Sequence, residues 1–127
     1  MRYLTQEDIL LIHSMVIDET GGSHGVRDHH LLASVEYAPR QAFGGKNLYG
    51  DLFSKAAVYA RDIIMNHPFI DGNKRTGMTA AFVFLEYNGR AFDVREGVIE
   101  KFAHEIIRRK LSINDIAAWF KKHSKKL

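Results

Sequence analysis

One short segment of the chain, His67-Pro68-Phe69-Ile70-Asp71-Gly72-Asn73-Lys74-Arg75, places an imidazole, a carboxylate, a glycine and two cations close together. Imidazole groups exchange protons near neutral pH, so His67 is a candidate general base. Asp71 offers a hard oxygen ligand, and Mg²⁺ is typically held by one or two carboxylates together with substrate phosphates. The segment therefore predicts a reaction in which a protein hydroxyl attacks a nucleotide phosphate.

The second half of this segment has the composition of an anion site. Gly72 allows a backbone turn that a side chain would obstruct. Asn73 is expected to begin a helix, whose free N–H groups and positive dipole end attract anions. Lys74 and Arg75 add two cations where helices prefer acids, and their mutual repulsion would be unfavourable unless an anion neutralised it. We therefore predict that Gly72, Asn73, Lys74 and Arg75 bind phosphate.

Each of these residues also has an ordinary structural interpretation. A histidine before a proline usually ends a helix, Asp-Gly is a common turn, and Lys-Arg is often solvated charge. These interpretations explain the residues one at a time. They do not predict all of them together at one helix–loop–helix junction, so we favour the functional interpretation.

The surrounding pattern predicts six helices. Four polar residues are placed to cap helix N-termini: Thr5, Asp28, Asp51 and Ser112. Helix ends are expected at Gly21-Gly22, before Pro39, near Asn66 and at Asn88-Gly89. In the first helix, Ile9, Ile12, Met15 and Val16 are assigned to one buried face.

The third and fourth helices are predicted to form the central pair of an all-α domain. Ala56, Ala57 and Ala60 on the third, with Ala80 and Ala81 on the fourth, would allow a close approach. Residues 40–50 are rich in glycine and are expected to form a loop or short extended flap. Residues 91–94 are assigned to a short extended piece.

Length and composition indicate a single globular domain spanning residues 1–127. The formal net charge is +3, and part of the excess lies in the tail at residues 121–126, which we interpret as a solvated, frayed end. Cysteine is absent, no apolar run suits a membrane span, and the first residues lack an apolar signal region. We therefore expect a cytoplasmic protein with no membrane partner.

The segment at 67–75 resembles the signature of the Fic/Doc superfamily, His-Pro-Phe-x-(Asp/Glu)-Gly-Asn-Gly-Arg-x-x-Arg. Two positions differ, because Lys74 stands for the family glycine and Met78 for the second arginine. This variant resembles the Doc, or death-on-curing, branch. The similarity extends upstream through Gly25-Val26-Arg27-Asp28 and Phe43-Gly44-Gly45, so it covers most of the chain. It implies a compact six-helix bundle with a short flap.

The resemblance implies a toxin that modifies a Ser or Thr hydroxyl of another protein, with ATP as co-substrate and Mg²⁺ as cofactor. His67 would be the general base and Asp71 the magnesium ligand. Signatures with two arginines suit transfer of AMP, whereas Doc-like proteins transfer the terminal phosphate, with elongation factor Tu as a target. Because the second arginine clamp is missing, we favour phosphoryl transfer and keep AMP transfer as the alternative.

The flap corresponds to the target-docking segment of the family: Phe43, Gly44, Gly45, Lys46, Asn47 and Leu48. An extended target peptide could pair with its backbone. The chain has no match to the inhibitory (Ser/Thr)-x-x-x-Glu-(Gly/Asn) helix of Fic-type proteins. We therefore expect restraint by a separate antitoxin, whose disordered tail would fold on binding.

Two other classes of function compete with this interpretation. A basic module could bind nucleic acid, but it would leave the motif unexplained, and we expect no nucleic-acid partner. A degenerate Fic fold could bind nucleotide or a partner without catalysis. His24, His29 and His30 lie near the first loop, but without cysteines or suitable carboxylate spacing we expect no metal site there.

Overall fold

The computed structural model describes residues 1–127 and contains six α-helices with a few short strands. The helices are α1 (Gln6–Thr20), α2 (His29–Tyr37), α3 (Leu52–Asn66), α4 (Asn73–Tyr87), α5 (Glu96–Arg109) and α6 (Ile113–Lys122). A 3-10 turn, η1 (Ala38–Arg40), follows α2. The strands pair as two antiparallel ribbons, β1 (Ala42–Phe43) with β2 (Lys46–Asn47) and β3 (Arg90–Phe92) with β4 (Ser124–Lys126). The predicted all-α class is confirmed.

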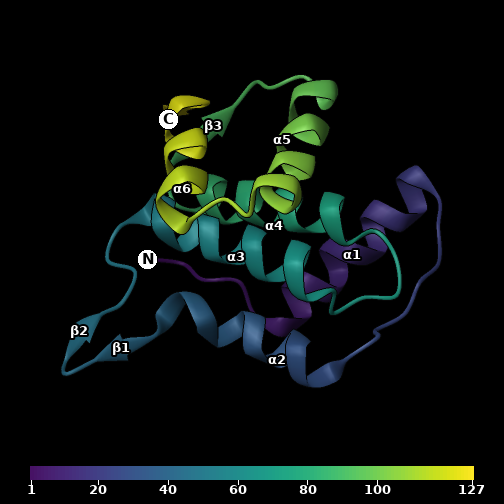
Figure 1. The fold of residues 1–127 in the computed structure, drawn as a ribbon, viewed down its shortest axis with the longest axis horizontal. Helices are drawn as coiled ribbons and strands as arrows, with labels where there is room; N and C mark the ends of the chain where they lie inside the picture. The colour runs from purple at the N-terminus through teal and green to yellow at the C-terminus, as the bar shows by residue number, and fades with distance from the viewer.

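Helices α3 and α4 form the centre of the molecule. In Figure 1, α2 covers one side of this pair, α5 and α6 cover the other, and α1 lies across one end. The buried core runs through all of these layers and includes Leu4, Ile9, Leu32, Tyr59, Ile63, Phe84, Ile106 and Phe120. The central pair therefore fixes the loop that joins α3 to α4.

All four predicted caps are present. Thr5 and Asp8 form a reciprocal capping box, in which the Thr5 hydroxyl accepts from the Asp8 N–H at 3.1 Å and the Asp8 carboxylate accepts from the Thr5 N–H at 2.8 Å. Asp28, Asp51 and Ser112 accept backbone N–H groups at the starts of α2, α3 and α6. The helix starts are thus set by local side-chain chemistry.

Two sequence predictions about local structure were wrong. Met15 is 60% exposed, because the buried stripe of α1 follows Ile9, Ile12, His13, Val16 and Ile17, and Met15 lies outside that spacing. The basic tail is not frayed, because Ser124–Lys126 pairs with Arg90–Phe92, which is also where the predicted extended piece lies. None of the helices is both long enough and apolar enough to cross a bilayer.

The close approach of α3 and α4 depends on Gly77 as well as on the predicted alanines. A Cβ at Gly77 would lie 2.7 Å from Ile64 Cγ1 and 3.0 Å from the Ala60 carbonyl oxygen. Backbone at that distance cannot move aside without separating the helices.

We therefore expect Gly77→Ala to lower the free energy of unfolding by about 1–3 kcal/mol through overpacking. Gly97 in α5 is the matched control, since a Cβ there meets nothing within 4 Å. Gly97→Ala should be neutral or stabilise by up to about 1 kcal/mol. Urea denaturation of both variants tests the contrast, and equal effects would show that the α3–α4 contact is not the cause.

Candidate active site

The predicted functional segment forms the junction between α3 and α4, residues 67–72, which we call the α3–α4 loop. His67 is the C-cap of α3 and takes a left-handed conformation, with φ 53° and ψ 61°. Its side chain is exposed and makes no hydrogen bond. Pro68 and Phe69 are both buried behind it. The loop thus presents the imidazole to solvent and anchors its own backbone in the core.

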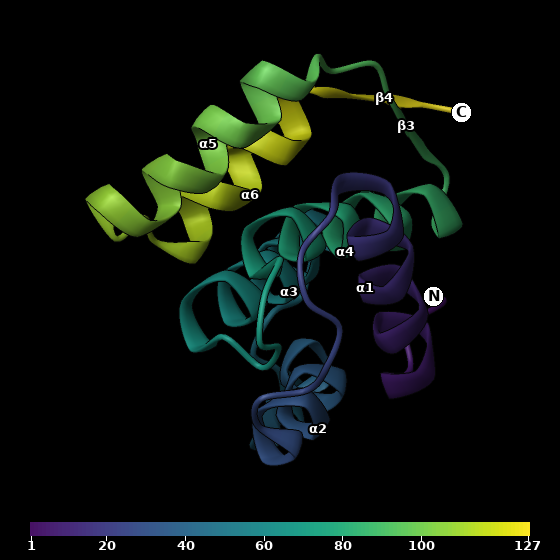
Figure 2. The ribbon, with the colours of Figure 1, turned by 90° about the vertical axis from the view of Figure 1, so that its right-hand side faces the viewer.

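The connection between α1 and α2 supports this loop along its length. Figure 2 shows the two connections running side by side. Val26 pairs with Phe69 in an isolated bridge, and the N–H groups of Arg27 and Asp28 donate to the Pro68 carbonyl at 2.8 and 3.1 Å. The Ile70 N–H donates to the Gly25 carbonyl at 3.1 Å. The α3–α4 loop is therefore held as one edge of an irregular ribbon.

Asn73 uses its side chain to close the loop. Its Oδ1 accepts from the Phe69 N–H at 3.1 Å, and its Nδ2 donates to the Phe69 carbonyl at 2.9 Å. The residue is 8% exposed. The side chain of Asn73 is therefore not available to bind an anion, and only its backbone N–H could bind phosphate as the sequence predicts.

The first turn of α4 carries free hydrogen-bond donors. Gly72 precedes it in a left-handed conformation, with φ 76°, and provides no side-chain cap. The N–H groups of Asn73, Lys74 and Arg75 have no acceptor in the structure. Because a helix N-terminus combines such donors with a positive dipole end, these three amides form a cradle for an anion.

A cavity of about 380 Å³ opens beside this cradle, between the first turns of α4 and the helix α5. Its rim is polar and includes Asp71, Gly72, Lys74, Arg75 and Glu96, while its apolar part comes from Met78, Phe82, Ile99 and Ala103. His67 does not line this cavity, and neither does any residue of the flap. The exposed imidazole therefore lies outside the set of residues that line the cavity.

The two cations of the motif have different partners. Arg75 donates to Glu96 at 2.7 Å, and both residues line the cavity, so the charge of Arg75 is neutralised by a residue of α5. The side chain of Lys74 is exposed and makes no ion pair or hydrogen bond. The unbalanced positive charge beside the cradle is therefore that of Lys74. Sequence reasoning missed Glu96, which lies 21 residues from Arg75 on another helix.

The carboxylate of Asp71 is held in one orientation by the backbone. Its Oδ2 accepts from the Ser23 N–H at 3.1 Å and its Oδ1 from the Gly72 N–H at 2.9 Å. A Cβ at Gly22 would lie 2.6 Å from Oδ2, so this close approach requires glycine. A carboxylate has about four acceptor positions, so two such bonds leave room for a cation.

A buried histidine that sequence reasoning missed lies behind the loop. His13 on α1 is 3% exposed and stacks on Phe69, with ring centroids 3.8 Å apart. Its Nε2 lies 2.8 Å from the Asp71 carbonyl oxygen and must carry the proton, because a carbonyl only accepts. The helical spacing from Ile9 to Ile17 would have placed His13 on the buried stripe of α1.

We expect the stability of the protein to fall as the pH is lowered through about 6.5, because burial lowers the pKa of His13 below its usual 6.5. The Asp71 carbonyl and carboxylate oppose this effect, and the neighbouring His24 adds to it. Between the lowered pKa of His13 in the folded protein and the usual 6.5, the unfolded chain binds a proton that the folded protein does not bind. This difference favours unfolding. Above that pH range, this group contributes no further pH dependence.

Thermal unfolding at a series of pH values tests this expectation. His13→Gln should remove most of the decline, since Gln keeps an N–H donor but does not titrate. A decline of the same size in His13→Gln would assign it to other groups.

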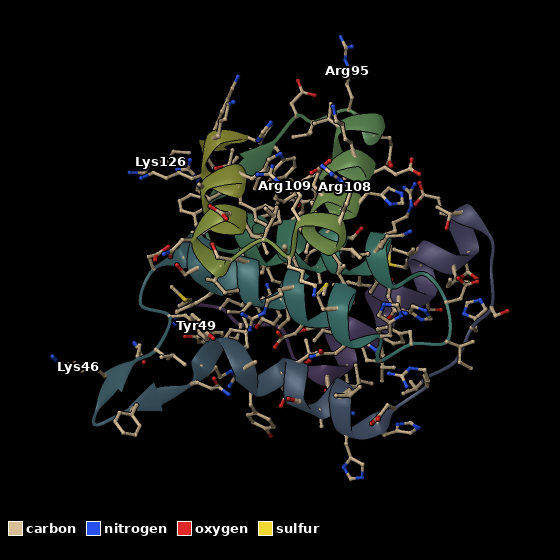
Figure 3. The ribbon with its side chains drawn as sticks, viewed as in Figure 1. Lys46, Tyr49, Arg95, Arg108, Arg109 and Lys126 are labelled. Atoms are coloured by element: carbon tan, nitrogen blue, oxygen red, sulfur yellow. The ribbon has the colours of Figure 1, made fainter.

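The flap is an antiparallel ribbon of two strands, each of two residues, with Gly44 and Gly45 at the turn between them, both at positive φ. Phe43 is 87% exposed and Leu48 is 57% exposed. In Figure 3, Lys46 points away from the body, and Tyr49 lies where the flap rejoins it. The buried Lys55 of α3 donates to the Pro39 and Tyr49 carbonyls, which bracket the flap.

The remaining histidines and cations form no obvious site. His24 pairs with Asp18 at 2.9 Å, His29 and His30 lie in the first turn of α2, and no three metal-ligating side chains gather anywhere. Figure 3 shows Lys126, Arg95 and Arg108 well separated on the molecule, and Arg108 is paired with Glu105 at 2.8 Å. These cations do not form one continuous basic patch.

Together the helical fold, the free amides and the adjacent carboxylate describe an all-α protein with a candidate anion site at a helix–loop–helix junction. The chain belongs to the Fic/DOC family, which matches residues 3–85. It is 36% identical over 120 residues to the toxin Doc of Mycolicibacterium smegmatis, covering 91% of this chain and 88% of that protein. It is 32% identical over 97 residues to the protein kinase doc of Escherichia phage P1, covering 76% of each.

Proposed function

We propose that the chain is the toxin of a toxin–antitoxin pair and acts in the cytoplasm as a protein kinase that uses ATP and Mg²⁺. The observation that carries this proposal is the first turn of α4, where three free N–H groups and the unpaired Lys74 border a cavity of about 380 Å³. Family membership and the relative named toxin Doc support the toxin role.

In this proposal the backbone of Asn73, Lys74 and Arg75 binds phosphate oxygens, and the ammonium of Lys74 balances their charge. Arg75 adds a second cation when phosphate displaces Glu96 from it. Asp71, already aligned by Ser23 and Gly72, holds Mg²⁺ together with the phosphates. Bound Mg²⁺ supplies neutralisation of phosphate charge.

His67 accepts the proton of the target hydroxyl from the exposed side of the loop. The hydroxyl oxygen forms a bond to the γ-phosphorus of ATP, the bond from that phosphorus to the β–γ bridging oxygen breaks, and ADP leaves. The fixed loop backbone positions the imidazole, so that the protein contributes mainly orientation and charge stabilisation.

Two observations favour phosphoryl transfer over AMP transfer. Met78 occupies the position of the second arginine in the Fic/Doc signature. Its apolar side chain is 1% exposed and lines the cavity. The cavity therefore lacks a second bidentate phosphate clamp. In addition, one relative is named a protein kinase.

The flap is the proposed docking site for the target. Its β2 edge and its exposed Phe43 suit an extended peptide that adds a strand beside it. From the family resemblance we propose a translation factor similar to elongation factor Tu as the target. The antitoxin partner would contribute a disordered tail that folds on binding, and copurification of the chain with a small neighbour-encoded protein would support it.

Two labelling experiments test the reaction type. The purified chain is incubated with cell lysate and with ATP labelled at either the α- or the γ-phosphate. Label that reaches protein from γ alone supports the kinase assignment, whereas label from α assigns AMP transfer. Transfer of neither label, with antitoxin removed and Mg²⁺ present, would contradict the enzymatic proposal.

A further inference from the structure

The side chain of Arg27 binds the backbone that carries His67. Its Nε donates to the His67 carbonyl at 2.6 Å, and its Nη2 donates to the Asn66 carbonyl at 2.7 Å. Its backbone N–H donates to the Pro68 carbonyl at 2.8 Å. One residue of the α1–α2 connection thus contacts three consecutive residues at the end of α3.

The side chain of Arg27 donates to carbonyl groups at the C-terminal end of α3. The last carbonyls of a helix lack partners within the helix, and a cation there also complements the dipole. His67 has φ 53°, and the left-handed region costs a residue with a Cβ roughly 1–2 kcal/mol. The guanidinium therefore stabilises a conformation that His67 would not favour by itself.

The geometry also requires the fork of a guanidinium. Two N–H groups on one planar side chain reach two successive carbonyls, which a Lys ammonium on its flexible stem does not reproduce. Arg27 is exposed and makes no ion pair, so it contributes to neither the core nor a charge network. Both side-chain acceptors lie on the residues that direct the imidazole.

We propose that Arg27 is a positioning residue for His67, which fixes the direction of the imidazole by clamping the backbone at the end of α3. This inference rests on the proposed role of His67 as general base. Arg27 itself touches no reacting atom. Its removal lets the His67 backbone relax toward right-handed values, which carries the imidazole away from the target hydroxyl.

The kinetic test compares Arg27→Ala and Arg27→Lys with the control Arg95→Ala. Arg95 is exposed, makes no hydrogen bond through its side chain and points away from the body in Figure 3. Both Arg27 variants should lose about 10- to 100-fold in kcat, because small misplacements of a catalytic group are costly. The KM for ATP should stay within about twofold, since the α4 cradle is not altered. Unchanged kcat in a folded Arg27→Ala protein would overturn the inference.

A second measurement does not depend on the reaction. The NMR resonances of the His67 backbone and imidazole should shift in Arg27→Ala and Arg27→Lys, and stay in place in Arg95→Ala. Their persistence in the Arg27 variants would contradict the clamp. If the resonances shift but His67→Ala keeps full transfer, the base role of His67 fails while the positioning contact stands.

A double variant separates positioning from general loss of stability. In the His67→Ala background, adding Arg27→Ala should lower transfer little further, because there is no imidazole left to direct. A full additional loss of 10-fold or more, as for an independent site, would assign Arg27 another role.

Discussion

Replacement of His67 by Asn is expected to lower transfer to the target by about 10²- to 10⁴-fold, the usual contribution of a positioned general base. Asn tolerates the left-handed conformation that position 67 requires, so the backbone should be retained. His67→Ala should show the same loss with a slightly greater cost in stability. Binding of ATP should persist, because the imidazole does not line the cavity beside α4.

The measurement is initial-rate transfer from labelled ATP, with nucleotide affinity measured separately. His104→Asn is the matched control, since His104 is exposed on α5 and its side chain makes no hydrogen bond. A rate near that of the unaltered protein in His67→Asn would remove His67 from the base role. Equal losses in both variants would point to a general effect of histidine replacement.

The helical scaffold could be predicted because its determinants are local. A cap such as Thr5 acts on residues three positions away, and glycine or proline ends a helix within one turn. The small residues of α3 and α4 likewise indicated which helices pack at the centre. Apolar residues at helical spacing indicated much of the buried core. Met15 was misassigned because it departs from that spacing by one position, and the tail because its partner, β3, is more than thirty residues away.

The loop motif could be recognised from its residue types, but the contacts that each of its side chains makes could not be predicted from them. Asn73 turns back to hold Phe69, Arg75 is neutralised by Glu96, and the α1–α2 connection supports the whole loop. The contact of Asn73 with Phe69 is local, whereas the other two join segments that are distant in sequence. Their residues carry no pattern of their own, because a single Arg, Ser or Glu in a loop or on a helix surface is ordinary.

Asp71 belongs to the motif, and the backbone of Ser23 and Gly72 holds its carboxylate in place. Asp71→Asn is expected to weaken Mg²⁺ binding in the presence of nucleotide and to lower transfer by roughly 10²-fold, as for a loss of about 3 kcal/mol of charge stabilisation. Asn keeps the shape and one acceptor oxygen, so the contact with Gly72 can survive. Loss of charge, rather than collapse of the loop, is then the cause.

Asp18→Asn provides the comparison, because Asp18 is a nearby exposed carboxylate whose only partner is His24. Titration of Mg²⁺ into each variant with a non-hydrolysable ATP analogue should separate them. Because Asp71 is aligned by Ser23 and Gly72 before any cation arrives, its removal costs affinity that extra Mg²⁺ restores only in part. Full recovery of transfer at high Mg²⁺ would mean that the phosphates hold the ion without this carboxylate, and that Asp71 serves the loop instead.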